Sequence, residues 1–450
     1  MRILLLTQYY VPETGAAQNR LADLATRLSH SSHSVTVLTA MPNYPKGEIF
    51  DDYKGHILLD EKCEGVRVIH GWLYATKSKE IVPRIANFIS FAVIAALIGI
   101  VKTGPQDLVI VESPPLFLGL SGWLLSRWKK CRFVLNISDL WPESAVALGV
   151  LRNPSIIRLA TRIEEFLYRR SDFITGQTEG IVASIQERFP GKAVQLLPNG
   201  VNVDSLLSPS ERESTRVRVQ AAFGLTDRFV VGYAGLHGLA QNLNTMLDAA
   251  QILARQKDIL FVFFGDGPEK EELIRDSNRM GLDNVKFYPP QAASRMPELL
   301  SAFDVAVVPL RRHRLFSGAL PSKLFECMGS GVPVIVAIDG EAKSLVEEAQ
   351  GGICVEPEDA LKLANAIVRL RGDKELRQAL GENGREFVTR HYNRQKIAQQ
   401  FEQSILTLIS GRSGKDAESL AVEHRCDITS LQEIDNPPKA RHLPVFTDTE

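Results

Sequence analysis

Short apolar runs rich in β-branched residues recur through the first part of the chain, and longer mixed segments separate them. The runs lie at residues 3–7, 35–39, 108–112, 133–137 and 173–175. Each run has the length of a buried strand, and the segments between the runs are long enough for a helix. This alternation predicts a doubly wound parallel sheet, so residues 1–200 are expected to form a first α/β domain.

The same alternation begins again in the second half of the chain. The runs there lie at residues 230–234, 260–264, 285–288, 305–308 and 332–336. They predict a second doubly wound α/β domain at 201–387, facing the first across a cleft. Residues 198–201 have turn chemistry, and the polar stretch from there to Asp227 lacks strand runs, so it is expected to act as a hinge.

The last two segments of the chain do not follow the strand-helix alternation. Residues 388–410 belong to a helix-rich stretch that is expected to close the second domain and cross back to the first. Residues 411–450 are polar and show no sustained apolar period. We expect this last segment to be a disordered tail.

Residues 85–101 form an unusually apolar segment in which only Asn87 and Ser90 are plainly polar. Its length is near the lower limit for crossing a bilayer. Three interpretations are open: a helix buried against a sheet or between domains, a helix lying in one membrane leaflet with Ile94 and Ile98 on its lipid side, and a true span. A span is least favoured, because runs expected in one sheet lie on both sides of the segment.

Aromatic and basic residues alternate at 119–133. Trp123 and Trp128 stand there beside Arg127, Lys129, Lys130 and Arg132. This mixture suits a lipid headgroup interface, although a surface helix followed by a strand explains it equally well. All four tryptophans of the chain fall in the first domain, which we therefore expect to face the membrane and an acceptor.

Polar residues in the segment 316–336 gather where a helix is expected to begin. Strand runs on both sides of the helix predict a parallel strand-helix-strand crossover. The first turn suits Pro321 or Ser322, and the end of the helix suits Gly329 and Gly331. The residues expected on the buried face are Leu324, Phe325 and Met328.

Two interpretations fit the polar residues at this helix start. In the first, they bind a ligand: free N–H groups attract phosphate oxygens, Lys323 adds a cation, and Glu326 accepts both hydroxyls of a ribose. In the second, Ser322 caps the helix, while Glu326 complements the helix dipole and pairs with Lys323. The residues alone do not separate the two.

Two carboxylates, Asp139 and Glu143, follow the predicted strand at 133–137. They are expected at the carboxyl edge of the sheet, where open parallel sheets bind their ligands. A proline between them suits a cleft rim. General-base, sugar-binding and structural roles are all open, the structural one being that Asp139 caps a helix beginning near Pro142.

Glycine turns follow several of the predicted strands. The turn at Gly15 lets the backbone approach the cleft or a phosphate group. It lacks the GxGxxG spacing, which disfavours a dinucleotide oxidoreductase. The turns at Gly235 and Gly265 are open to both a ligand role and a plain-turn role. His237, within the first of these two turns, is expected to be neutral and solvated.

Composition narrows the possible functions. The formal net charge of -1 gives no overall field that would draw the chain to nucleic acid, so no such partner is expected. The five cysteines include no CxxC pair, which favours a reducing compartment and disfavours a zinc site. No Asp-x-Asp pair occurs, and neither a metal nor a cofactor is expected. The N-terminus has one basic residue and an apolar run too short for a secretory signal, and the cysteine pattern leads us to expect a cytoplasmic protein.

Three motifs resemble those of family 4 glycosyltransferases, particularly the branch that builds bacterial capsules, exopolysaccharides and O-antigens. They are PSKLFExMxxGxPVI at 321–335, AGxxGxAQxL at 234–243 and DLWPES at 139–144. The resemblance covers roughly residues 1–405 and implies the GT-B fold, in which two Rossmann-like domains hold the donor and the acceptor. It also implies that Gly235, Gly238 and Gln241 face a nucleotide diphosphate and that Asp139 contacts the acceptor or the donor sugar.

One position departs from the family pattern. Many members have a glutamate eight positions before Glu326, and it is linked to contacts with the transferred sugar, whereas this chain has Gly318 there. The resemblance then implies that this role is either missing or taken by backbone amides. The residues that would supply those amides are Ser317, Gly318, Ala319 and Leu320.

Together these features predict a hexosyl-transferring enzyme that moves a sugar from a nucleotide diphosphate donor, expected to be a UDP-sugar, to a lipid-linked saccharide. It would act as a peripheral protein at the inner face of the cytoplasmic membrane. The family implies retention of anomeric configuration. Without an Asp-x-Asp pair, we expect helix N-termini and Lys323 to meet the charge of the leaving group instead of a metal, so Asp139 and Lys323 are the expected catalytic residues. Two alternatives remain: a nucleotide-sugar epimerase of the same fold, and a degenerate membrane scaffold or accessory subunit, suggested by Gly318.

Overall fold

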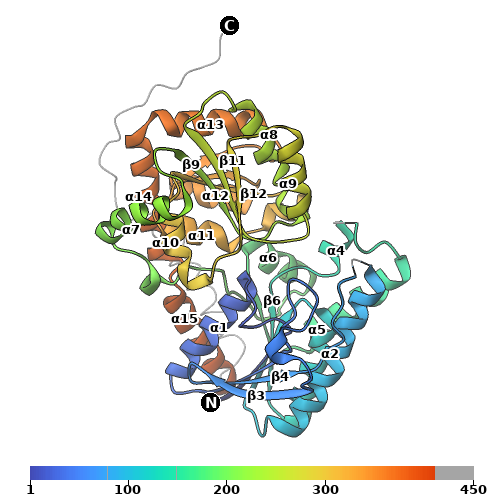
Figure 1. Ribbon diagram of the computed structural model, residues 1–450. Coiled ribbons are helices and arrows are strands. Elements are labelled where there is room, and N and C mark those ends of the chain that lie inside the picture. Colours follow the sequence, from blue (N-terminus) through green and yellow to red (C-terminus); the bar gives the residue numbers. More distant parts are fainter. Residues whose placement is uncertain (79, 148, 411–450) are drawn as a thin grey trace.

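The computed structural model describes residues 1–78, 80–147 and 149–410, so the tail expected at 411–450 lies outside the described residues. Two α/β domains lie one above the other in Figure 1, the N-terminal domain in blue and green and the C-terminal domain in yellow and orange. Each is built on one mainly parallel sheet covered by helices. This arrangement confirms the predicted fold class.

The sheet of the first domain has eight strands in the order β3-β4-β2-β1-β5-β6-β7-β8, and only the edge pair β3 and β4 is antiparallel. The strands are β1 (Arg2–Leu6), β2 (Ser34–Ala40), β3 (Leu58–Cys63), β4 (Val66–Gly71), β5 (Leu108–Ser113), β6 (Arg132–Ile137), β7 (Phe173–Gly176) and β8 (Val194–Leu196). The helices are α1 (Ala16–His30), α2 (Ile81–Lys102), α3 (Leu116–Lys129), α4 (Glu143–Ala147), α5 (Pro154–Arg170) and α6 (Glu179–Arg188).

The strand runs predicted for this domain coincide closely with β1, β2, β5, β6 and β7, but the prediction lacks β3, β4 and β8. Strand β3 reads LLDEKC and lies at the edge of the sheet, so its polar residues face water and the apolar pattern is lost. It joins β4 through Glu64 and Gly65, whose φ angles of 47° and 85° suit a two-residue hairpin. Strand β8 is only three residues long.

The sheet of the second domain has six parallel strands in the order β11-β10-β9-β12-β13-β14. The strands are β9 (Phe229–Ala234), β10 (Ile259–Phe264), β11 (Val285–Tyr288), β12 (Val305–Pro309), β13 (Val334–Ala337) and β14 (Gly352–Cys354). The helices are α7 (Pro209–Phe223), α8 (Asn244–Ile252), α9 (Lys270–Arg279), α10 (Met296–Ser301), α11 (Ser322–Gly329), α12 (Glu341–Glu348), α13 (Ala360–Gly372) and α14 (Lys374–His391). The short edge strand β14 is absent from the prediction.

The polar stretch expected to act as a hinge contains helix α7 instead. Ser208 and Glu211 form a capping box at the start of this helix. Arg216 on α7 pairs with Asp304 before β12, with 2.8 Å between the guanidinium nitrogen and the carboxylate oxygen. Most of the stretch is therefore part of the second domain, and its polarity reflects a solvated helix face.

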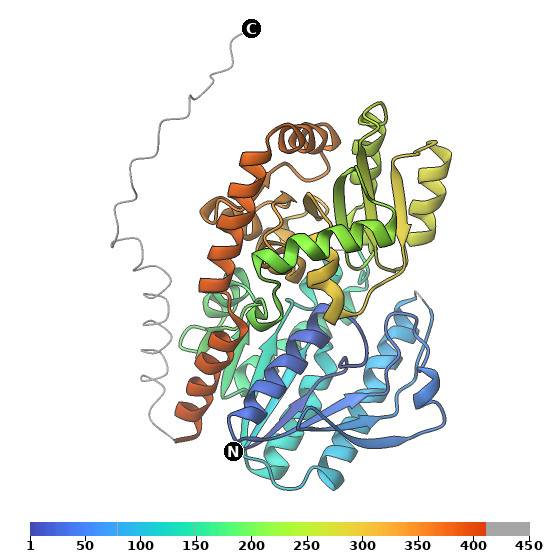
Figure 2. The same cartoon turned by 60° about the vertical axis from the view of Figure 1, so that its left-hand side comes forward.

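The chain returns to the first domain between α14 and α15 (Arg394–Ser410), which Figure 2 shows in line along the side of both domains. Helix α15 packs against α1 and buries Phe401 and Ile405 in the core of the first domain. The two crossing segments pair with each other, because the Val201 N–H donates to the Tyr392 carbonyl at 2.9 Å. The crossing lies a few residues after the predicted start at 388.

The apolar segment expected at 85–101 is the longer helix α2. It is the one helix in the described part of the chain that is long and apolar enough to cross a membrane. Its inner face, which includes Phe91 and Ala95, is buried against β2, β4 and α3. Ile98 is also buried and Ile94 packs against the same core, so these two residues do not lie on a lipid side as expected.

A buried polar cluster lies at the carboxyl ends of β5 and β6, directly beneath the cleft. Arg20 of α1 donates to the Glu112 carboxylate at 2.6 Å and to the Ser138 hydroxyl at 2.8 Å. Asn136 also donates to Glu112. The Arg20 and Glu112 side chains are only 6% and 4% exposed, so each charge is compensated by the other instead of by water. The cluster holds the strand end from which Asp139 follows.

We expect the Arg20→Met variant to lower the free energy of unfolding by about 3 kcal/mol or more, because it leaves the Glu112 charge buried without its cation. Denaturant unfolding measures the loss. The matched control is Arg2→Met, whose guanidinium pairs with Asp107 at the surface and is 51% exposed, so water replaces the pair at little cost. Equal losses in the two variants would contradict a structural role for the buried pair.

Candidate functional site

A cleft of about 2040 Å³ separates the two domains and is lined by loops from both. The structure brings almost all of the predicted site residues to this cleft. They are Gly15, Asp139, Glu143, Gly235, Gln241, Gly265, Ser317, Gly318, Ala319, Leu320, Ser322, Lys323 and Glu326. The exception is Gly238, which precedes the short 3-10 helix Leu239–Gln241 and does not line the cleft.

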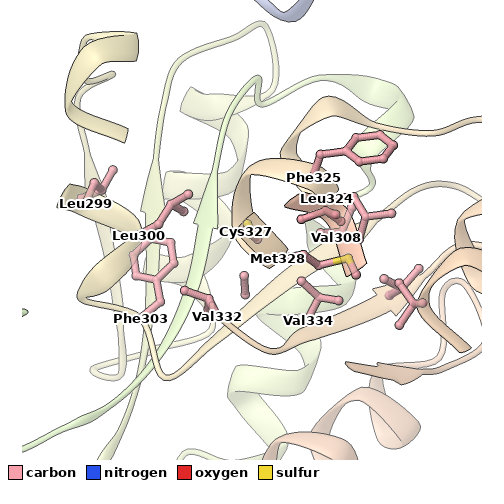
Figure 3. Packing of buried hydrophobic residues seen from close by; sticks show 14 of the residues in the cluster. Leu299, Leu300, Phe303, Val308, Leu324, Phe325, Cys327, Met328, Val332 and Val334 are labelled. Atoms are coloured by element: carbon pink, nitrogen blue, oxygen red, sulfur yellow. The ribbon is translucent and has the colours of Figure 1, made fainter. Parts of the chain in front are cut away.

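Helix α11 begins at Ser322 after Pro321 and ends at Gly329, as predicted. Its apolar face packs into the core of the second domain, and Figure 3 shows Leu324, Phe325 and Met328 among the buried side chains there. No side chain caps the start of the helix, so the interpretation of Ser322 as a cap is wrong. Burial of the apolar face leaves Ser322, Lys323 and Glu326 along the cleft.

Lys323 lies over Tyr233, a residue at the end of β9 that the sequence did not single out. Its Nζ donates to the Tyr233 hydroxyl at 2.5 Å and lies 3.9 Å from the centre of the ring. The Tyr233 hydroxyl donates in turn to the Leu236 carbonyl at 2.6 Å. Tyr233 therefore holds the lysine and the glycine turn after β9 in one arrangement.

Glycine is required where the turns after β9 and β10 meet Lys323. Gly235 has a φ of 144°, and a Cβ added there would lie 2.9 Å from the Lys323 Nζ. Gly265 has a φ of 147°, and a Cβ there would lie 1.9 Å from the Gly235 carbonyl oxygen. Both turns are thus held against each other by backbone contact, which a side chain would prevent.

His237, expected to be solvated, is instead completely buried in this pair of turns. Its ring lies among the rings of Tyr233, Phe263 and Phe287. Burial, helped by the nearby charge of Lys270, lowers the pKa of His237 to about 4, so the ring is neutral. Phe263 and Phe287 belong to β10 and β11, so the burial of His237 depends on how the strands pack. The local sequence around His237 does not reveal it.

Burial shifts the pKa values of the two charged side chains on α11 that line the cleft, Lys323 and Glu326. Burial lowers the pKa of Lys323 to about 8. It raises the pKa of Glu326, although the charges of Arg394 and Lys323 act in the opposite direction. No donor among the described residues makes a hydrogen bond to the Glu326 carboxylate, so it is available to a ligand. Arg394, at the start of α15, also lines the cleft and was not predicted.

The loop before α11 forms the 3-10 helix Arg314–Gly318 and lines the cleft with backbone. The Ala319 N–H already donates to the Phe316 carbonyl at 3.0 Å, so this amide is not free for a sugar. Asn199, from the first domain, donates to the Leu320 carbonyl at 3.1 Å. The loop is therefore held from both domains.

On the other side of the cleft, Asp139 follows β6 and lies close to Ser144, whose hydroxyl donates to its carboxylate. Burial raises the pKa of Asp139. Helix α4 begins at Glu143, so the Ser144 bond ties the Asp139 carboxylate to a side chain in the first turn of this helix. Both carboxylates nevertheless line the cleft, where Glu143 is exposed.

Glu13, two residues before Gly15, joins two loops of the first domain and was not predicted. Its carboxylate accepts from the backbone N–H groups of Asn43 at 2.7 Å and Tyr44 at 2.8 Å. Burial raises the pKa of Glu13 to about 7. The contact joins the loops after β1 and β2, both of which reach the cleft. The sequence shows a glutamate close to a glycine turn but gives no sign of its partners. The nearer partner, Asn43, lies 30 residues further along the chain.

No group of three or more His, Cys, Asp and Glu side chains in residues 1–78, 80–147 and 149–410 is arranged to hold a metal ion. The positive charge at the cleft is supplied by side chains. The cations that line it are Lys46, Arg314, Lys323 and Arg394.

Comparison with known proteins assigns each domain to a family model. Residues 15–200 match the glycosyl transferase 4-like domain, and residues 218–387 match the glycosyl transferases group 1. The chain is similar to the putative colanic acid biosynthesis glycosyl transferase WcaI of Escherichia coli, with 25% identity over 89% of this chain and 98% of that protein.

Two further proteins are similar over almost the whole length. A GDP-mannose-dependent alpha-(1-6)-phosphatidylinositol monomannoside mannosyltransferase of Mycobacterium tuberculosis is 25% identical over 88% of this chain and 96% of that protein. The solved structure of HepE from Anabaena with UDP-glucose shares the fold with a TM-score of 0.68, at 18% identity, over 90% of this chain and all of that chain. The chain belongs to the group 1 glycosyltransferases of family 4, enzymes of the GT-B fold that use nucleotide sugars.

Proposed function

We propose that this protein transfers a sugar from a UDP-sugar to a lipid-linked saccharide in the synthesis of a cell-surface polysaccharide. The observation that carries the donor site is the arrangement at the start of α11. There, Lys323 and Glu326 line the cleft beside the N–H groups of Ser322 and Lys323, which have no acceptor among the described residues. These N–H groups and the Lys323 cation suit a diphosphate, and the Glu326 carboxylate suits the two hydroxyls of a ribose.

The same groups suit the chemistry of transfer. As the bond to the sugar breaks, negative charge develops on the leaving diphosphate, and a lysine at a helix N-terminus stabilises that charge. Asp139 and Glu143 lie on the opposite side of the cleft, where an acceptor would enter. In the retaining reaction that we propose, the departing diphosphate takes the proton of the attacking hydroxyl, and Asp139 orients the acceptor or the sugar.

Similar proteins leave the nucleotide base open. The Anabaena structure contains UDP-glucose, whereas the Mycobacterium relative is named for GDP-mannose. Neither the epimerase nor the scaffold interpretation is supported by the relatives, which are named as transferases. Titrating UDP and GDP in parallel distinguishes the bases.

We expect Glu326→Ala to weaken UDP binding about tenfold to a hundredfold, as for loss of a charged hydrogen-bonding group. Isothermal titration measures the affinity. The matched control is Glu271→Ala, an exposed glutamate on α9 that does not line the cleft. Unchanged UDP affinity in a folded Glu326→Ala protein would exclude the ribose contact.

Lys323 makes nucleotide binding dependent on pH. With its pKa lowered to about 8, the lysine is a cation below that pH and becomes neutral above it. UDP affinity should therefore be highest at or below pH 7 and fall several-fold as the pH rises through 8 to 9. The Lys323→Met variant should bind weakly and show a flatter profile, and it controls for titration of the nucleotide itself. Parallel profiles for the two proteins would contradict the assignment.

The acceptor side offers an apolar surface on α2 and α3, which we propose lies against the membrane. Its exposed residues are Ile89, Val93 and Leu97 on α2 with Leu124 and Trp128 on α3. Exposed cations, Lys102, Arg127 and Lys130, stand near the C-terminal ends of these helices. Apolar side chains flanked by cations suit a helix lying in the interface of an anionic membrane.

Helix α2 is also joined to the cleft. The Gln8 side chain donates to Asn87 of α2 at 2.7 Å, and Gln8 is followed by Tyr9 and Tyr10, which line the cleft. A lipid lying along α2 could therefore present its saccharide to the site. A peripheral arrangement accounts for this better than a span, because the inner face of α2 is part of the core of a single sheet.

We expect the double variant Val93→Asp, Leu97→Asp to lose binding to vesicles that contain phosphatidylglycerol, because both side chains are more than half exposed on the proposed face. Flotation of vesicles measures binding, and UDP affinity reports that the cleft is intact. The control is Val217→Asp, which alters a residue that is 64% exposed on α7 of the second domain. Undiminished flotation of the double variant would exclude this face.

A further inference from the structure

Glu341, at the start of α12 in the second domain, reaches across to the first domain. Its carboxylate accepts from the Gly180 N–H at 2.5 Å and from the Glu179 N–H at 3.1 Å. These N–H groups belong to the first turn of α6, where a helix leaves its donors without partners. A negative charge is most favourable at this end of a helix dipole. A carboxylate of one domain thus caps a helix of the other.

Residues on both sides are small enough to allow this contact. A Cβ added at Gly180 would lie 2.7 Å from the Glu341 Oε1. A Cβ at Gly318 would lie 3.5 Å from the same oxygen and 4.0 Å from the Gly180 Cα. Gly340 precedes Glu341, has a φ of 81°, and packs so closely on the Ser317 carbonyl that a Cβ would lie 2.0 Å from it. Helix α6, helix α12 and the loop at 314–318 therefore meet at one point.

The position of this junction relates it to the donor site. Ser317 and Gly318 line the cleft, whereas Glu341 lies behind them and does not. Burial raises the pKa of Glu341, and the two backbone N–H groups act in the opposite direction. The carboxylate is therefore placed to fix the loop without touching a bound sugar.

We propose that Glu341 is an interdomain latch, a positioning residue that holds the two domains closed on the donor loop at residues 314–318. In the closed arrangement the carboxylate satisfies the free N–H groups of α6. When the domains separate, that contact is lost and the loop is released from the first domain. Gly318 belongs to this arrangement, because a carboxylate at position 318 would stand beside Glu341 and repel it.

The first test measures closure in Glu341→Ala, with Glu347→Gln on the exposed side of α12 as control. Hydrogen exchange of the Glu179 and Gly180 amides should accelerate at least about tenfold, the scale of one charged hydrogen bond, and small-angle scattering of the ligand-free protein should give a larger radius of gyration. Sugar transfer should fall by a similar factor through kcat, with UDP affinity of the second domain little changed. Unaltered amide exchange and radius would overturn the latch.

A variant in the first domain distinguishes loss of the contact from misfolding of α12. Gly180→Ala should open the same contact from the first domain, whereas Gly372→Ala, where an added Cβ meets no atom within 4 Å, should not. Faster exchange at residue 179 in Gly180→Ala supports the latch, and unchanged exchange counts against it.

A double-mutant cycle tests the relation to Gly318. Gly318→Glu should open the domains when Glu341 is present, because two carboxylates then compete at one place, and should do so much less in the Glu341→Gln background. Additive effects of the two changes would overturn the coupling. The scattering and exchange measurements need no nucleotide, so they stand even if the donor proves not to be a UDP-sugar.

Discussion

The arrangement of this protein depends on the shared direction of its strands. In each domain the central strands run parallel, so every chain segment that leaves a strand at its carboxyl end emerges at the same edge of the sheet. Loops from these edges of both sheets line the cleft between the domains. Asp139 after β6, Gly235 after β9 and Gly265 after β10 reach one cavity for this reason, although they are far apart in the sequence.

At that edge, the second domain holds a lysine that is partly buried and lines the cleft. Lys323 is supported by the Tyr233 ring and hydroxyl, and its pKa falls because burial disfavours the charge. A bound diphosphate would stabilise the charged form of this lysine, because its negative charge would lie beside the lysine and beside backbone N–H groups without an acceptor among the described residues. The same burial explains why the turns after β9 and β10 have glycines: side chains there would displace either the lysine or the neighbouring backbone.

The domains are joined at two places, the crossing of the chain and the far side of the cleft. At the crossing, the Val201 N–H donates to the Tyr392 carbonyl, and α15 is buried on α1. Across the cleft, the polar contacts of Asn199 and Glu341 both end on or beside the loop that precedes α11. The proposed closure of the cleft would therefore also fix the donor loop at residues 314–318.

Local sequence determined a large part of this structure. Alternating apolar runs located most strands of both sheets, and the spacing of Leu324, Phe325 and Met328 assigned the buried face of α11. Both predictions succeed because strands and helices bury side chains at fixed intervals along the chain, which the local sequence records. The tertiary structure decided what those patterns cannot contain: the polar edge strand β3, the buried His237, and the partners of Lys323, Glu13 and Glu341. Strand β3 pairs with its neighbour β4 in the chain, and its place at the sheet edge removes the apolar pattern. The burial of His237 and the partners of Lys323, Glu13 and Glu341 depend on residues many positions away in the chain, whose distance and shielding from water are set only when the sheets and domains pack together.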